Sequence, residues 1–453
     1  MVETFNLIKY LTVDRHKGKI IWLLNIGAEK YWNKANSGVI DRNEDMIVNR
    51  VEEMNLLICR EQDVIILREK PDEAYLINLQ QLGFSIPRIL IPESSDLLSP
   101  ISELILKDDR LLRELARIAM NQEDVYFVPY AVTYLEEQIA ENCGLKIIAA
   151  PSRVNAMVND KIFNRAVAET LGLEICKGEV CCTVEEIKQE YDNLVNNAPF
   201  FEKIIIKEPY GASGKGLYIV ESEDKLSPIL TRIARLSRNE TNSKWLVEGW
   251  YPKKADINFQ IYISQEGSVD VFSIKQQILR DTVYIGSKSP ADVSEDILNT
   301  YKEYGEIIGK YLFQIGYTGV AGIDSIITNE GTIIPVIEIN GRFTLSTYIS
   351  FIGNVLGESK IFSRYFKLIL DSPHDYKEIC SALDREGILY NAETGEGVLV
   401  YTSGTLPLRL DEGSGVYAGR LFTLIASKDW STVDEYSSRL EALIERKFAN
   451  SLI

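Results

Sequence analysis

The segment 319–342 constrains the fold more than any other part of the chain. It reads GVAGIDSIITNEGTIIPVIEINGR, two runs rich in β-branched residues joined by a short polar turn. This pattern predicts an antiparallel hairpin. Because side chains alternate along a strand, Glu338 and Asn340 share one face, and a turn centred on Gly331 places Asp324 opposite Glu338 on that face.

Two carboxylates and an amide on one patch of an apolar sheet indicate a cation between them, because like charges at such a distance repel each other. Oxygen ligands suit a hard ion such as Mg²⁺, which prefers a few carboxylates together with phosphate oxygens. Arg342 follows directly and is placed to face the anion that such an ion would carry. The alternative is a half-exposed hairpin with ordinary solvated charges, and the hairpin alone leaves both interpretations open.

Length and charge set the class of the protein. With 453 residues, the chain should fold into two or more domains. Its formal net charge of −17 argues against binding to nucleic acid or to an anionic membrane, since both need a basic surface. A few lysines and backbone amides would still suffice to bind phosphate locally.

Cysteine and histidine are used sparingly. The six cysteines lack zinc-ligand spacing, so we expect reduced thiols in a cytoplasmic protein. His16 and His374 have no catalytic motif around them, which argues against triad hydrolases and histidine zinc sites. The N-terminus does not resemble a signal peptide, and no apolar run reaches the ~20 residues of a membrane helix.

Residues 20–150 alternate short apolar runs with helical patterns, which predicts a mostly parallel α/β sheet. No GxGxxG follows the first apolar run, so this part lacks a dinucleotide fingerprint, and we expect a scaffold domain that completes a cleft. The expected strands are 20–27, 63–69, 87–92, 125–130 and 145–151, and the expected helices include 72–82 and 102–120.

A second unit begins near residue 153. Asn159 and Asp160 offer a helix cap, an amphipathic pattern follows, and Gly172 ends it. Lys161 lies in the first turn of this helix. On its own, such a lysine is usually only solvated.

The segment 203–222 reads KIIIKEPYGASGKGLYIVES, a glycine-rich loop between two β-runs. A Rossmann or Walker loop opens onto a helix, so neither motif applies here. A glycine hairpin can instead fold over phosphates and donate backbone N–H groups. Lys207 sits inside an apolar strand, where an unpaired ammonium is costly and a phosphate or a purine nitrogen would be a natural partner. The alternative is a plain hairpin turn.

The chain from 245 to 281 reads as three further strands. WLVEGWY contains Glu248, whose carboxylate could accept a proton from an adenine amino group, and Asp256 on the next strand could meet a ribose hydroxyl. The run 269–281 contains Lys275 and Arg280, either of which could instead be a surface charge. We expect a loop over the polar residues 285–296 and a helix over 297–312.

After Arg342 the chain continues as FTLSTYISFIG, and a helical region is expected from there to about 370. The tail from 385 alternates again, with strands expected near 396–402 and 417–427, and it shows no chemistry beyond closing the fold. A capping box, Thr432 with Glu435, predicts the start of the last helix. Its buried residues should be Val433, Tyr436, Leu440, Leu443 and Ile444.

In order, these features are a helix lysine, a strand lysine, a strand–glycine loop–strand unit, a VEGW segment, and an aspartate followed by Glu-x-Asn-x-Arg. This combination resembles the ATP-grasp superfamily, with EINGR and its upstream aspartate as the most specific part. The resemblance implies an α/β chain of four parts. These are a Rossmann-like pre-ATP-grasp domain (1–150), a small lid subdomain (151–255), a large subdomain with the metal site (256–372) and a C-terminal α+β extension (373–453).

The resemblance also implies a role for each motif residue. Lys161 and Lys207 would contact the phosphates of ATP, and Lys207 also the adenine. Asp324 stands where many members have glutamate, which keeps the charge on a shorter side chain. The other implied roles are the lid over the triphosphate (Gly211, Ser213, Gly214, Gly216), adenine and ribose contacts (Glu248, Gly249, Trp250, Asp256), two Mg²⁺ ions with Mn²⁺ as a substitute (Asp324, Glu338, Asn340), and contacts to the phosphoryl group or the substrate carboxylate (Arg342, Arg280, Lys275).

The implied activity is ATP-dependent ligation. A carboxylate is a poor electrophile, but transfer of the γ-phosphoryl group turns it into an acyl-phosphate that a nucleophile can attack, with ADP and phosphate as products. The donor would be a small carboxylic acid such as an amino acid, as in natural-product pathways. The acceptor would be an amine, a peptide or the thiol of an acyl carrier protein. The protein itself could form a homodimer.

Two other functions remain open from the sequence. Some ATP-grasp proteins phosphorylate hydroxyl groups, so a small-molecule kinase is an alternative that would form no acyl-phosphate. A non-catalytic nucleotide-binding regulator would be expected to lack metal ligands or Arg342, all of which are present.

Overall fold

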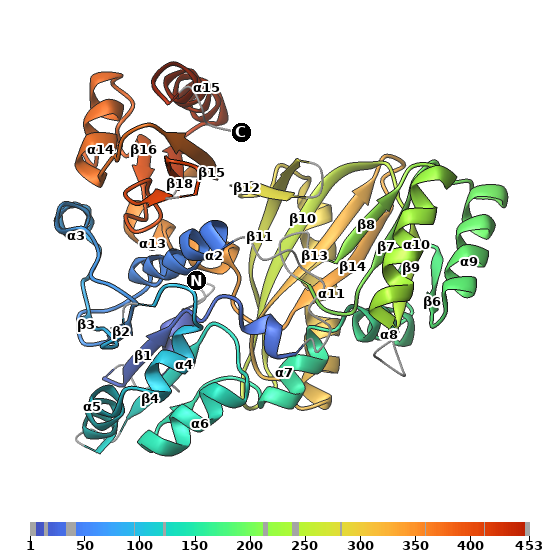
Figure 1. Cartoon of the computed structure of the whole chain (residues 1–453), viewed down its shortest axis with the longest axis horizontal. Coiled ribbons are helices and arrows are strands. Elements are labelled where there is room, and N and C mark those ends of the chain that lie inside the picture. Colours follow the sequence, from blue (N-terminus) through green and yellow to red (C-terminus); the bar gives the residue numbers. More distant parts are fainter. Residues whose placement is uncertain are drawn as a thin grey trace.

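The chain forms three sheets with helices packed against them. The computed structural model describes residues 6–12, 17–32, 42–94, 96–120, 124–211, 216–237, 244–280, 283–357, 359–411 and 413–448. Figure 1 shows the N-terminal domain (blue to cyan) next to the C-terminal extension (orange to red), with the small green sheet at the other end of the molecule. The mixed α/β fold class is confirmed. Across these described stretches, no helix is long and apolar enough to cross a membrane.

The N-terminal sheet is parallel, as the sequence predicted, and its strand order is β3-β2-β1-β4-β5. Both faces of its central strand are buried, which explains the continuous apolar run Ile20–Leu24. The strands are β1 (Lys19–Leu23), β2 (Val64–Ile66), β3 (Arg88–Leu90), β4 (Val125–Pro129) and β5 (Lys146–Ile147). The helices are α1 (Leu7–Leu11), η1 (Ala28–Tyr31), α2 (Arg42–Asn49), η2 (Arg50–Leu57), α3 (Glu73–Gln81), α4 (Ile101–Leu106), α5 (Asp109–Met120), α6 (Tyr134–Cys143) and α7 (Ser152–Val158).

The small sheet is antiparallel, in the order β6-β9-β7-β8, and the glycine loop joins its strands β7 and β8. Asp160 caps the helix that precedes it, because its carboxylate accepts from the N–H groups of Ile162 and Phe163. The predicted helix start is therefore confirmed. The elements are α8 (Lys161–Thr170), β6 (Gly178–Cys181), α9 (Val184–Asn196), β7 (Ile204–Lys207), β8 (Leu217–Val220), α10 (Glu223–Ser237) and β9 (Trp245–Gly249).

The large sheet has the path β14-β13-β10-β11-β12-β15-β18-β16, with β17 paired to β18. Helix α11 covers one face, where Tyr301, Ile308 and Leu312 pack against Ile257 and Ile261. The opposite face is free to carry polar side chains. The strands are β10 (Lys253–Ile263), β11 (Val269–Arg280), β12 (Val283–Ser289), β13 (Gly319–Thr328), β14 (Ile333–Asn340), β15 (Lys360–Leu370), β16 (Gly397–Val400), β17 (Leu410–Asp411) and β18 (Val416–Ser427). The helices are α11 (Glu295–Gln314), α12 (Leu345–Ile349), α13 (Gly353–Leu356), α14 (Tyr376–Arg385) and α15 (Trp430–Lys447).

Four sequence predictions were wrong in detail. Strand β12 occupies the start of the loop expected over 285–296, and strand β15 occupies the end of the region expected to be helical. The helix expected over 102–120 is divided into α4 and α5, because the Asp108 carboxylate accepts from the N–H of Leu111 and starts a new helix. Helix α15 begins three residues early, since Asp429 rather than Thr432 is its cap.

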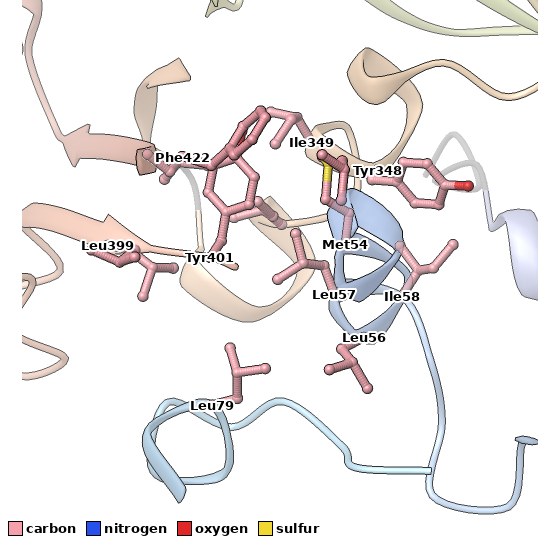
Figure 2. Packing of buried hydrophobic residues seen from close by; sticks show 14 of the residues in the cluster. Met54, Leu56, Leu57, Ile58, Leu79, Tyr348, Ile349, Leu399, Tyr401 and Phe422 are labelled. Atoms are coloured by element: carbon pink, nitrogen blue, oxygen red, sulfur yellow. The ribbon is translucent and has the colours of Figure 1, made fainter. Parts of the chain in front are cut away.

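The N-terminal domain and the C-terminal extension share one hydrophobic core. Residues from η2 and α3 pack against residues from α12 and from the strands β16 and β18. Figure 2 shows Leu56 and Leu57 on one side of this core, and Leu399, Tyr401 and Phe422 on the other. The extension therefore packs directly on the first domain.

Candidate active site

The predicted acidic patch forms on the hairpin of β13 and β14. Asp324 lies opposite Glu338 in the register, as predicted, and Asn340 lies opposite Gly322. Nδ2 of Asn340 donates to Oδ2 of Asp324 at 3.2 Å. The three side chains proposed as metal ligands thus lie on one face of the large sheet. We call them the acidic patch.

Neighbouring strands hold the Asp324 carboxylate in place. Nδ2 of Asn258 on β10 and Nε2 of Gln277 on β11 each donate to Oδ1 of Asp324 at 2.8 Å. Gln260 orients Asn258 in turn, because its Nε2 donates to Oδ1 of Asn258 at 2.6 Å. Burial and then the charge of Glu338 raise the pKa of Asp324 to about 7. The alternation of β10 places Asn258 and Gln260 on the same face as Asp256, whereas Gln277 comes from a neighbouring strand whose pairing no local pattern predicts.

The donor set of the acidic patch fits magnesium. Within the described stretches, no group of three or more His, Cys, Asp or Glu could hold a metal ion by itself. Two carboxylates and an amide oxygen are too few for a closed site. They match the way Mg²⁺ is held by one or two carboxylates together with phosphate oxygens. The residues therefore fit an ion that is bound jointly with a nucleotide.

Lys161 begins α8 and reaches the acidic patch. Its Nζ lies 2.9 Å from Oε1 of Glu338 and donates to the backbone oxygen of Gly211 at 3.0 Å. The side chain is only 4% exposed. Lys161 is therefore not a solvated lysine. It links the start of the glycine loop to the acidic patch.

Lys207 is paired within its own sheet. Its Nζ lies 2.6 Å from Oε2 of Glu248, and Nη1 of Arg165 lies 2.9 Å from Oε1 of the same carboxylate. Burial acts to lower the pKa of Lys207, but the charge of Glu248 outweighs it and the pKa is raised. A phosphate or purine partner was expected for this ammonium, whereas Glu248 neutralises it in the structure. The contact of Glu248 with adenine remains a prediction.

The backbone after β9 was also expected to hold adenine. The N–H of Gly249 donates to the carbonyl oxygen of Lys177 at 2.9 Å, and the N–H of Trp250 donates to that of Lys203 at 2.8 Å. Both N–H groups are therefore engaged by neighbouring backbone. An adenine contact by these residues would have to use other atoms.

Asp256, the predicted ribose contact, lies opposite Gln277 on the polar face of the large sheet. Its Oδ1 is 2.6 Å from Nζ of Lys253, and Lys253 also lies over the ring of Trp250, 5.2 Å from the centroid. Burial raises the pKa of Asp256. The structure thus brings Asp256 and Trp250 to the same lysine.

The glycine loop is described at its two ends. Gly211 and Gly216 belong to the described part, whereas Ser213 and Gly214 lie outside it. Gly216 has a φ of +76°, and its carbonyl oxygen accepts from the N–H of Glu208 at 2.8 Å. A Cβ at Gly216 would come within 3.1 Å of the Glu208 side chain, so both space and conformation favour glycine here. The role of the loop as a lid stays a prediction.

Arg342 connects the acidic patch to the N-terminal domain. Its Nη1 donates to the hydroxyl oxygen of Tyr130 at 2.7 Å, and its guanidinium carbon lies 5.0 Å from the centroid of that ring. Tyr130 follows β4 directly. The sequence missed this residue, although the carboxyl end of a parallel strand is a common place for a ligand-binding side chain.

Lys275 lies opposite Asn258 on the polar face and is fully buried. Its Nζ donates to the backbone oxygen of Ser346 at 2.6 Å and contacts the hydroxyl oxygens of Ser346 and Ser350. Burial lowers the pKa of Lys275 to about 7. The backbone of Arg280 ends β11, and its side chain lies outside the described part.

At the acidic patch, Lys161 of α8, the helix before the small sheet, lies beside Glu338 of the large sheet, an arrangement typical of an enzyme that holds a nucleotide between two sheets. Family models agree with this class. A pre ATP-grasp domain matches residues 51–145, an ATP-grasp domain matches 166–344, and a PGM1 C-terminal domain matches 378–440. Residues 51–145 and 166–344 thus match the two domains of the ATP-grasp arrangement that the sequence resemblance implied.

Two curated proteins show the extent of the likeness. The chain is 28% identical to the [butirosin acyl-carrier protein]–L-glutamate ligase of Niallia circulans over 447 residues, which cover 95% of this chain and 96% of that protein. It is 24% identical to human mitochondrial pyruvate carboxylase over 281 residues, 61% of this chain but only 21% of that protein. The first likeness spans the whole chain and the second only part of it.

Solved structures share the fold. The N5-carboxyaminoimidazole synthetase of Staphylococcus aureus superposes with a TM-score of 0.53 at 12% identity, covering 98% of this chain and 100% of that one. The biotin carboxylase domain of the Hydrogenobacter thermophilus 2-oxoglutarate carboxylase, solved with MgADP and bicarbonate, gives 0.55 at 15% identity, covering 94% and 89%. At such identities the likeness shows the fold alone.

Proposed function

We propose that the protein activates the carboxylate of an amino acid with ATP and transfers the acyl group to the thiol of an acyl carrier protein. The observation that carries this proposal is the likeness to the carrier-protein–L-glutamate ligase, which runs through all three matched domains. L-glutamate is accordingly the first substrate to test. An amine or a peptide is the alternative acceptor.

The chemistry proceeds in two displacements. A carboxylate oxygen of the substrate attacks the γ-phosphorus of ATP, the bond to the β–γ bridging oxygen breaks, and ADP leaves. The thiolate of the acceptor then attacks the acyl carbon, the bond from that carbon to the phosphate oxygen breaks, and phosphate leaves. Neither step needs a nucleophilic side chain of the enzyme, so catalysis depends on position and charge.

The described residues supply both. Glu338 and Asp324, with Asn340, would hold Mg²⁺, which when bound adds positive charge to the phosphate oxygens; two ions, or Mn²⁺, are compatible with this set. When ATP binds, the Lys161 ammonium would leave Glu338 and contact a phosphate oxygen instead. Arg342 would donate to the phosphoryl group in transfer.

The substrate side of the site would contain the buried amine of Lys275. Because its pKa lies near 7 and only neutral oxygens surround it in the structure, a bound carboxylate would supply the missing counter-charge. Arg280, at the end of the same strand, is the second candidate for this contact. Lys207, Glu248 and Asp256 belong to the nucleotide side in this proposal.

Trapping with hydroxylamine tests the first step. The purified protein is incubated with ATP, Mg²⁺, hydroxylamine and each amino acid in turn, and both ADP and the hydroxamate are measured. We expect the two products in equal amounts with one or a few acids, and neither product from a Glu338→Gln variant. Tight ATP binding without ADP release for any carboxylic acid would contradict the proposal.

The mass of the acceptor tests the second step. A carrier protein bearing its phosphopantetheine arm should gain the mass of the acyl group only when ATP and the amino acid are both present, and hydroxylamine should remove it because the bond is a thioester. Transfer to free amines but not to the carrier thiol would favour the amide-forming alternative.

A small-molecule kinase remains the second candidate, because ATP-grasp chemistry can end with phosphoryl transfer to a hydroxyl group. The same trapping assay separates the two, since a phosphorylated alcohol yields ADP but no hydroxamate.

A further inference from the structure

The polar face of the large sheet continues past β11 into the C-terminal part of the chain. The register pairs Gln277 on β11 with Ser287 on β12, and Ser287 with Ser363 on β15. Side chains that lie directly opposite each other on antiparallel strands point to the same face. Because Gln277 also donates to Asp324, a row of polar side chains leads from the acidic patch to β15.

This row ends in four hydroxyl groups. The hydroxyl of Tyr284 donates to Oγ of Ser287 at 3.1 Å and is also hydrogen-bonded to Ser363. The hydroxyl of Tyr401, just after β16, lies 3.3 Å from Oγ of Ser363. We call these residues the hydroxyl cluster. One of its four members, Tyr401, comes from the tail for which the sequence predicted no chemistry.

A small cavity lies beside the hydroxyl cluster. Its volume of about 10 Å³ is enough for roughly one water molecule. Helix α12 forms one wall, and the same helix presents Ser346 to the buried amine of Lys275. Figure 2 shows Ile349, Tyr401 and Phe422 around this part of the core. The lining includes Tyr284, Leu345, Ile349, Ser363, Tyr401 and Phe422.

The chemistry of the cavity suits an oxygen acceptor. Burial raises the pKa of Tyr284 to about 12 and that of Tyr401 well above its ordinary value, so both stay protonated and can donate. Arg364 also borders the cavity, but its Nη1 donates to Oγ of Ser437 at 3.1 Å and bonds Glu441 as well. The groups offered to a ligand are therefore neutral hydroxyls.

We propose that the hydroxyl cluster is the subsite that recognises the oxygen-bearing side chain of the substrate, while the reacting carboxylate lies between Lys275 and the acidic patch. This inference rests on the proposed ligase function and deepens it. Strands β11 and β15 are two strand spacings apart, each about 4.8 Å. That span matches an amino acid whose side chain carries an oxygen a few atoms from the α-carbon, so that this single oxygen of a carboxylate, amide or hydroxyl reaches the water-sized cavity.

The subsite would select by the hydrogen bonds that it gains with the right acid. An oxygen on the substrate side chain would enter the water-sized cavity and bond its hydroxyls, whereas an alanine-sized acid leaves the cavity as it is. A site built to hydrogen-bond a substrate oxygen rejects analogues that lack it more strongly than an apolar pocket rejects a missing methylene.

The test uses Tyr401→Phe and Ser363→Ala in the full chain, with Tyr376→Phe as the control. Tyr376 is a buried tyrosine whose hydroxyl contacts Asn78 and the backbone of Val400. We measure kcat/KM with L-glutamate, L-glutamine and L-alanine, and the rise in melting temperature that each amino acid causes without ATP. Tyr401→Phe should lower kcat/KM about tenfold for the acid with the preferred oxygen-bearing side chain and leave that for alanine unchanged. The control should change neither.

Several outcomes would overturn the subsite. Equal losses for all acids, or a lower melting temperature with unchanged substrate preference, would make the hydroxyl cluster purely structural. If wild-type protein turns over no acid, the ligase proposal fails, but thermal stabilisation still reports on the cluster. The subsite would then still be supported if glutamate raises the melting temperature of the wild-type protein but not that of the Tyr401→Phe variant. Equal responses of both would remove it.

Discussion

Two buried lysines of the site are held in opposite ways. Lys207 in the small sheet faces the Glu248 carboxylate, which also bonds Arg165. Lys275 in the large sheet is as deeply buried but is held by the hydroxyl groups and a carbonyl oxygen of α12. The pKa of Lys207 is therefore raised, whereas that of Lys275 falls to about 7.

The Lys207 ammonium is charged without any ligand, whereas a bound ligand would favour the charged form of Lys275. Around Lys207 the charges are paired locally, because Glu248 faces both Lys207 and Arg165, and Glu169 on α8 also pairs with Arg165. Around Lys275, neutral dipoles replace a counter-ion, and an incoming carboxylate would favour the protonated amine. The Lys207 side would thus suit a ligand that is the same in every reaction, whereas the Lys275 side would suit a carboxylate that differs between substrates.

The largest effect should come from removing the negative charge of Glu248, which pairs with Lys207 in the small sheet. Glu248→Gln keeps the shape of the side chain but leaves Lys207 buried without its counter-charge and Arg165 with Glu169 alone, which should lower the free energy of unfolding by about 3–5 kcal/mol. Chemical denaturation followed by fluorescence measures this loss.

The matched control is Glu306→Gln, which breaks an exposed pair with Lys310 at 2.5 Å. Such a pair contributes about 0–1 kcal/mol. Similar losses for Glu248→Gln and Glu306→Gln would show that the buried charges do not act as a unit.

Next in size is the effect of Arg342 on the reaction. Arg342→Lys keeps a positive charge but loses the planar donors, and we expect kcat to fall about 100- to 1000-fold while ATP binding stays within a few-fold. Initial rates of ADP release measure kcat, and titration with nucleotide measures ATP binding. Tyr130→Phe, which removes only the acceptor of one Arg342 bond, should cost much less. Comparable losses in the two variants would assign Arg342 a structural role instead.

The hairpin could be predicted in detail because its information is local. The turn and the alternation of β13 and β14 fix which residues lie opposite each other, and Asp324 does lie opposite Glu338. The cap Asp160 and the parallel N-terminal sheet were equally evident from short patterns.

The partners across the sheets could not be predicted, because they depend on which strands become neighbours. Arg165 and Glu248 are 83 residues apart in sequence, and no local pattern pairs them. Strand β15, KIFSRYFKLIL, is buried on both faces along most of its length, and its polar residues Ser363, Arg364 and Lys367 do not alternate, so it lacks the period of two that marks a half-buried strand. Missing β15 also hid the continuation of the polar face into the C-terminal extension.

The titration of Lys275 should be visible in the stability of the protein. Its pKa is about 7 in the folded chain against an ordinary 10.5, so between these values the unfolded chain binds a proton that the folded chain lacks. The free energy of unfolding should therefore rise with pH above 7, by about 1.4 kcal/mol per pH unit from this group. Lys275→Met should remove that slope. Parallel pH profiles for wild type and variant between pH 7 and 9 would show that Lys275 keeps its charge when buried.

The smallest expected effect comes from removing one of the amides that hold the Asp324 carboxylate in place. Gln277→Met removes one of the three side-chain amides that bond Asp324, while Asn258 and Asn340 still donate. Mg²⁺ should then bind about tenfold more weakly in the presence of ADP, at the lower end of the range for groups behind a metal ligand. Calorimetric titration measures this, with Gln276→Met as the control, because Gln276 points to the other face of β11. A weakening as large in Gln276→Met would mean that the strand as a whole, and not the bond to Asp324, supports the ion.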